Sequence, residues 1–118
     1  IHCQMFIGKY GCAVSTAGGS GADDVVGYLN GILQTLGANT VGGVGVVFAG
    51  DPEAIVPAEG RAYELGKRLV RAIEKKETYP EQEERHAAML ERMRTLILAN
   101  KDRWHHEYDH WKAAGRLP

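Results

Sequence analysis

The chain has 118 residues, 44% of them hydrophobic and 25% charged, with a formal net charge of −1. These values fit a single domain with an apolar core, and they give no general attraction to nucleic acid or to an anionic membrane. No apolar run approaches the ~20 residues that span a bilayer, and no signal peptide is visible at the N-terminus.

The two cysteines, Cys3 and Cys12, are too few for a disulfide framework or for a cysteine-ligated iron–sulfur cluster. We therefore expect reduced thiols in a cytoplasmic protein with no nucleic-acid and no membrane partner. Because the chain begins with Ile1 and not with Met, we also expect it to be part of a longer sequence.

The first predicted elements are a strand and a helix. The small apolar run Tyr10–Ser15 is typical of a strand buried on both faces of a parallel sheet. Apolar residues then recur at helical spacing over Asp24–Leu36, and Gly37 follows as a C-terminal stop. Asp23 or Asp24 is expected to N-cap this helix, where its charge also suits the positive end of the helix dipole.

The second strand is predicted within Asn39–Phe48, which is rich in β-forming residues but interrupted by glycines. Glycine inside a strand indicates a bulge or another group lying against the backbone. Either the whole run is a strand, or only Thr40–Val44 is, with 45–57 as a loop. Pro57 fits the first turn of the helix that follows.

The C-terminal half is predicted to be helical. Apolar residues from Ala58 to Ile73 share one face, and Pro80 begins a further helix that runs to about Asn100. A short last helix over Trp104–Ala114 carries an aromatic stripe of Trp104, Tyr108 and Trp111 at positions i, i+4 and i+7. The predicted order is β-α-β-α-α-α, an α/β fold whose two strands are too few to form a self-covering sheet.

A glycine-rich segment joins the first strand to the first helix. Gly18, Gly19 and Gly21 lack side chains, and Ser15, Thr16 and Ser20 add hydroxyl groups. A strand, a glycine-rich loop and a helix N-terminus together present main-chain N–H groups to an anion or to an electron-rich ring. The segment matches neither the P-loop nor the dinucleotide fingerprint, so a ligand cradle and a simple flexible connection both stay open.

Several of these segments resemble the C-terminal half of the flavodoxin-like NAD(P)H-dependent FMN reductases, and most of all their iron–sulfur flavoprotein branch. The resemblance extends over nearly the whole chain, including a helical C-terminal extension that begins near Asn100. The matching segments are Gly8-Lys9-Tyr10-Gly11, Ser15 to Gly21, Leu36-Gly37-Ala38, Thr40 to Val44, Asn100-Lys101-Asp102, Trp104, Glu107-Tyr108 and Trp111-Lys112.

The resemblance implies a flavodoxin-like, three-layer parallel sheet, of which residues 1–78 are the C-terminal part and residues 79–118 a helical extension. It implies FMN as cofactor and NAD(P)H as substrate, with the flavin at the carboxyl ends of the strands. The residues lining the flavin would be Ser15, Thr16, Ala17, Gly18, Gly19 and Gly21. The family's phosphate loop and cluster cysteines would lie upstream, and Cys3 and Cys12 do not fit the cluster motif, so this chain does not support an iron–sulfur cluster.

Two other features bear on function. His106 and His110 lie one helical turn apart beside Glu107, but zinc usually needs three or four convergent ligands, so solvated histidines are favoured. The aromatic stripe is expected to dock on another subunit, making the protein a homo-oligomer, dimer or tetramer, through its C-terminal helices.

Three functions follow from the sequence. The first is an FMN-dependent NAD(P)H oxidoreductase, or its C-terminal portion, with no catalytic side chain because the flavin carries the chemistry. The second is a non-catalytic oligomerisation module derived from a flavodoxin-like fold. The third is a phosphate-ligand binder without redox chemistry.

Overall fold

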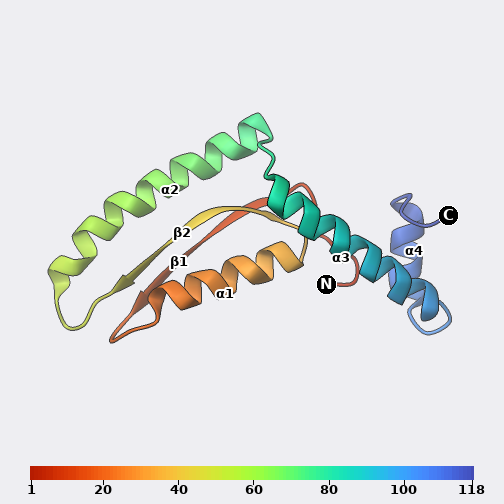
Figure 1. Cartoon of the computed structure of the whole chain (residues 1–118), viewed down its shortest axis with the longest axis horizontal. Helices are drawn as coiled ribbons and strands as arrows, with labels where there is room; N and C mark the ends of the chain where they lie inside the picture. The colour runs from red at the N-terminus through yellow and green to blue at the C-terminus, as the bar shows by residue number, and fades with distance from the viewer.

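A computed structural model describes residues 1–118 and confirms an α/β fold built on a parallel sheet (Figure 1). The order of elements agrees with the prediction, apart from one added turn of 3₁₀ helix. The elements are β1 (Tyr10–Ala17), α1 (Ala22–Thr35), β2 (Asn39–Val47), the 3₁₀ helix η1 (Pro52–Ala54), α2 (Ile55–Lys75), α3 (Pro80–Ala99) and α4 (His105–Ala113).

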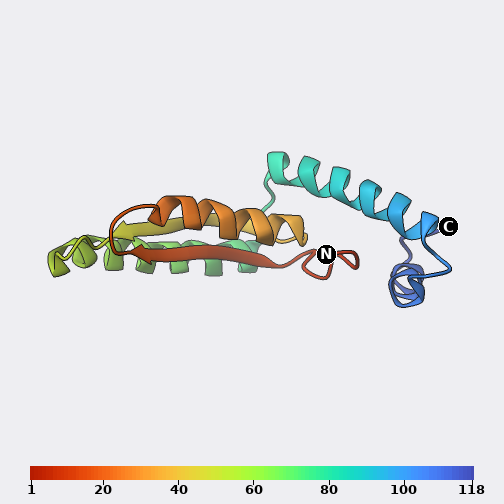
Figure 2. The same cartoon turned by 90° about the horizontal axis from the view of Figure 1, so that it is seen from below.

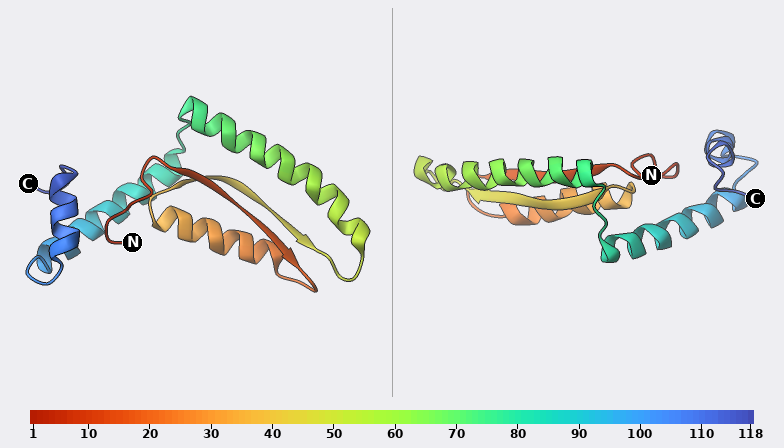
Figure 3. Two further views of the ribbon diagram at one scale, coloured as in Figure 1. Left: turned by 180° about the vertical axis from the view of Figure 1, so that it is seen from behind. Right: turned by 90° about the horizontal axis from the view of Figure 1, so that it is seen from above.

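The sheet has two strands, which lie between α1 and α2 as the middle of three layers (Figure 1). Tyr10 pairs with Asn39 and Ala17 with Val47, with one irregularity near Gly11. Both arrows point to the same end of the molecule (Figure 3, left). This is the arrangement expected of a parallel β-α-β unit, and each strand has one partner only.

The second strand is continuous from Asn39 to Val47, so the shorter alternative, Thr40–Val44 followed by a loop over 45–57, is wrong. Its glycines are needed because α1 packs directly on the strand. A Cβ atom at Gly45 would lie 2.9 Å from the carbonyl carbon of Ala22, at the first turn of α1. A Cβ at Gly43 would overlap the side chain of Val26. These are the close backbone approaches that glycine within a strand indicates.

Other boundaries also differ from the prediction. Helix α1 begins at Ala22, and its N-cap is Gly21 with φ 84°, so neither Asp23 nor Asp24 is the N-cap. Both aspartates lie in the first turn, where their charge still suits the helix dipole. Helix α2 begins at Ile55, because η1 starts the helical path before Pro57 does.

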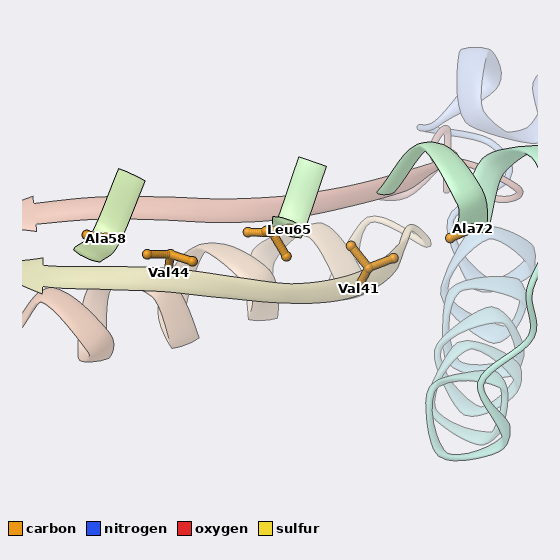
Figure 4. Close-up of a cluster of buried hydrophobic side chains, with 5 residues drawn as sticks. All are labelled: Val41, Val44, Ala58, Leu65 and Ala72. Carbon is orange, nitrogen blue, oxygen red and sulfur yellow. The ribbon is translucent and has the colours of Figure 1, made fainter. Parts of the chain in front are cut away.

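The main apolar cluster lies between β2 and α2 (Figure 4). Val41 and Val44 of the strand meet Ala58, Leu65 and Ala72 of the helix. Ala58 and Leu65 lie on the apolar face predicted for this helix, whereas Ile73, predicted on the same face, is 50% exposed and Ala72 is buried instead. Small side chains dominate the cluster, so α2 can lie close to the strand.

A second, separate cluster joins α3 to α4. Trp111 is almost fully buried against Met93 and Ile97, and its indole N–H donates to the carbonyl oxygen of His2 at 2.8 Å. The last residue of the aromatic stripe is thus covered by this chain, so Trp111 is not available to dock on another subunit. Trp104 precedes α4 as its N-cap residue and does not belong to the helix.

Helix α3 leads away from the sheet and carries α4 to the far end of the molecule (Figure 2). The radius of gyration is 17.8 Å, whereas a compact chain of this length has about 13.5 Å. Gln82 ties the start of α3 to the sheet. Its side-chain amide accepts from the N–H of Thr40 at 2.8 Å and donates to the carbonyl oxygen of Thr40 at 2.9 Å, as a neighbouring strand would.

Candidate functional site

The candidate site is the turn between β1 and α1, at the carboxyl ends of the two parallel strands (Figure 1). The structure divides the predicted residues into two groups. Ser15, Thr16 and Ala17 belong to the end of β1, where they pair with β2, and are not part of the loop. The loop itself comprises residues 18–21, so it is shorter than the sequence predicts.

The main-chain N–H groups of this loop have no partner within the protein. None of the N–H groups from Gly18 through Asp24 donates to a protein acceptor, whereas the N–H of Val25 donates to the carbonyl oxygen of Gly21 at 3.1 Å. The first turn of any helix has such free N–H donors, and here the preceding loop adds further free N–H groups next to them. The site can therefore donate several hydrogen bonds to one ligand edge.

The loop is also open. Gly18 and Gly19 are exposed, and a Cβ atom at either position would meet no atom within 4 Å. No helix of this chain lies over the loop, so a planar group could reach its backbone. Gly21 needs to be glycine for a different reason, since its positive φ starts α1.

The charges at the site are negative. Asp23 and Asp24 lie in the first turn of α1, and neither forms an ion pair within the chain. Two carboxylates beside the free N–H groups oppose a phosphate, which carries its own negative charge. An uncharged acceptor, such as a ring carbonyl, meets no such repulsion.

The turn after β2 contributes residues that the sequence reasoning missed. The N–H of Phe48 donates to the carbonyl oxygen of Ala17 at 2.7 Å, and that of Ala49 donates to Gly18 at 2.9 Å. Phe48 is 37% exposed beside the loop, and Ala49 has a positive φ of 46°. A left-handed non-glycine residue stores strain, which often occurs at ligand sites. The signal that could have found them is their place at the carboxyl end of the neighbouring parallel strand.

The remaining chemical groups do not form a site. No three His, Cys, Asp or Glu side chains come close enough together to hold a metal ion. Burial raises the pKa of the Cys12 thiol, which disfavours the reactive thiolate. His105 and His106 are exposed on α4, far along the chain from the loop. His110 is partly buried and its Nε2 atom has no hydrogen-bond partner, so the prediction of a solvated histidine is wrong at that position.

Comparison with known proteins adds no identification, since no family model, curated protein or solved structure matches this chain. None of its helices combines the length and the apolar character needed to cross a membrane.

Proposed function

We propose that this chain is the flavin-facing part of an FMN-dependent NAD(P)H oxidoreductase with a flavodoxin-like fold. The observation that carries the proposal is the row of free main-chain N–H groups from Gly18 to Asp24, in an open turn at the carboxyl ends of parallel strands. In α/β sheets, ligands commonly bind at these strand ends.

The fit to a flavin is partial. Free N–H donors match the carbonyl and nitrogen acceptors along the polar edge of an isoalloxazine ring, and Phe48 gives an apolar surface nearby. When bound, FMN supplies the redox chemistry, taking a hydride from NAD(P)H and passing electrons to an acceptor. The residues of this chain would orient the ring by donating main-chain hydrogen bonds to its uncharged acceptors.

The FMN phosphate does not fit this turn, because Asp23 and Asp24 repel it. The same two carboxylates count against a phosphate-ligand binder. We therefore expect this chain to bind the ring system and to distinguish poorly between FMN and riboflavin, which lacks the phosphate.

The test is a fluorescence titration of both flavins with three proteins: the unchanged chain, Gly18→Pro and Gly18→Ala. Proline removes the free N–H, and Ala17 before it already has the extended backbone that proline requires. Alanine keeps the N–H and is the matched control. Loss of one hydrogen bond should weaken binding about 3- to 10-fold for Gly18→Pro alone.

Two results would refute the proposal. One is the absence of quenching by either flavin at any protein concentration. The other is equal affinity of Gly18→Pro and Gly18→Ala, because the N–H groups would then not contact the ring.

A second candidate function is a non-catalytic oligomerisation module that associates through α3 and α4. It is favoured by the elongated shape, in which α3 extends beyond the sheet (Figure 2). Leu98 is the exposed large hydrophobic residue of these two helices. If they mediate association, Leu98→Lys should lower the mass measured by light scattering, whereas flavin binding should be absent throughout.

A further inference from the structure

The solvent face of α1 is unusual for a surface helix. After Asp24 the helix has no charged residue, and Val25, Tyr28 and Ile32 expose large apolar side chains. Gly27 and Gly31 are also in this helix, and a Cβ atom at either would meet nothing within 4 Å. Figure 2 views the molecule from this side and shows α1 with no other element across it. Surface helices normally present charged and polar residues to water.

The total exposed area of the chain is also larger than a compact monomer would have. The accessible surface is 7678 Å², whereas a compact monomer of this mass has about 6,300 Å². The excess, about 1,400 Å², is larger than the ~800 Å² that each partner buries in a standard protein interface. Of the exposed large hydrophobics, α1 and α2 contribute four each, and α3 and α4 contribute only Leu98. Those of α2 lie among charged residues, whereas α1 has no charged residue after Asp24.

The C-terminal end of α1 offers a cavity with unpaired positive charge. A cavity of about 460 Å³ lies there, with Gly31 and Thr35 of α1 on one side and Arg85 and Arg92 of α3 on the other. Neither arginine forms an ion pair in this chain, although Arg85 donates to the Gln34 side chain at 3.1 Å. The N-terminal end of the same helix has the opposite charge, because Asp23 and Asp24 are unpaired there.

We infer that α1 packs against α1 of a second copy of this chain, antiparallel about a two-fold axis. With the axis midway between Tyr28 and Gly31, Tyr28 of each copy lies opposite Gly31 of the other and fills the cavity beside it. Asp24 of each copy then lies opposite Thr35 of the other, next to Arg85 and Arg92. An isologous interface of this kind makes every contact twice.

This assignment goes beyond the proposed function and does not depend on flavin binding. A second copy is favoured as the occupant because the two ends of one helix carry complementary charges, which an antiparallel pair brings together. Tyr28 and Gly31, which would meet across the interface, also lie on the same helix. Both features are self-complementary, as a two-fold interface requires.

The first experiment measures the mass of the 118-residue chain by light scattering, with Tyr28→Lys and Tyr63→Lys as a matched pair. Tyr28 and Tyr63 are both 70% exposed, and each has an acid four residues earlier, Asp24 or Glu59. Tyr63 lies on α2, outside the inferred interface. The unchanged chain and Tyr63→Lys should be dimers, and Tyr28→Lys should raise the dissociation constant by about tenfold or more.

The second experiment exchanges the charges. Asp24→Lys and Arg92→Glu should each weaken the dimer, and the two together should restore it, because each copy then offers the reversed pair. Circular dichroism checks that all variants are folded. Flavin titration of Tyr28→Lys, Arg92→Glu and the unchanged chain keeps this result separate from the proposed function, because neither residue belongs to the proposed flavin site. Asp24 does belong to that site, so its variants are compared by their dimerisation only.

Three results would overturn the inference. The unchanged chain could be a folded monomer at every concentration, which would leave the α1 face to another protein or segment. The dimer could persist in Tyr28→Lys and dissociate in Leu98→Lys, which would assign it to the C-terminal helices. The double variant Asp24→Lys with Arg92→Glu could dimerise more weakly than either single variant, which would show that Asp24 and Arg92 do not face each other across the interface.

Discussion

Replacing Gly43 with alanine tests whether the glycines of β2 exist to admit α1. The added Cβ would lie 2.9 Å from the carbonyl oxygen of Ala13 and would overlap the side chain of Val26. Neither neighbour is the end of a long flexible chain, so strand and helix must move apart. Overpacking of this kind costs about 1–3 kcal/mol.

This cost is large for a chain with few buried residues, since domains are stable by only about 5–15 kcal/mol. With a urea dependence of about 1–3 kcal/mol per molar, the midpoint of unfolding should fall by about 1 M. The measurement is urea unfolding followed by circular dichroism. A second variant, Val26→Ala, relieves part of the overlap, so in combination with Gly43→Ala its effect should be less than additive.

The matched control is Gly60→Ala, which adds the same methyl group in α2, where a Cβ atom would meet nothing within 4 Å. Alanine is the better helix former, so this variant should be more stable by about 0.5–1 kcal/mol. The reasoning fails if Gly43→Ala unfolds at the same urea concentration as the unchanged chain, or if both alanine variants shift the midpoint in the same direction.

Gln82→Ala leaves the main-chain N–H and carbonyl of Thr40, a residue only 7% exposed, without their partner. The free energy of unfolding should fall by about 1–3 kcal/mol, and hydrogen exchange at the Thr40 amide should become faster. Unchanged protection of that amide would contradict this prediction. Trp111→Ala should remove about 3–5 kcal/mol from the α3–α4 cluster alone, so limited proteolysis should cut between those helices while the sheet stays folded; concerted unfolding of the whole chain would show that the two clusters are one. Burial, and after it the hydrogen bond to Glu77, raises the pKa of Tyr79 in the folded chain. As the pH rises past about 10, the unfolded chain therefore loses this proton first. The contribution of Tyr79 to the free energy of unfolding is complete below that pH and decreases above it. In urea unfolding across this range Tyr79→Phe should flatten the decrease, and an equally steep decrease would exclude Tyr79 as its source.

The local order of the chain could be predicted from sequence because its signals lie within a few residues of one another. The helix begun by Pro80 and the apolar face shared by Ala58 and Leu65 both follow from spacing and from the backbone limits of single residues. Parallel pairing of the two strands also follows, because a helix joins them. The position of the candidate loop after the first strand was predictable for the same reason.

The tertiary structure decided what each ambiguous residue does. In the sequence Gly43 and Gly45 suggest a broken strand, but in the structure they leave room for α1 to pack on β2. Trp111 suggests an exposed docking residue, but in the structure α3 covers it. Phe48 joins the candidate site only because β2 ends beside β1. These roles depend on contacts between segments that are distant in the chain, so no local sequence pattern predicts them. Helix and strand formation depends on residues that are close together in the sequence and can therefore be predicted from it.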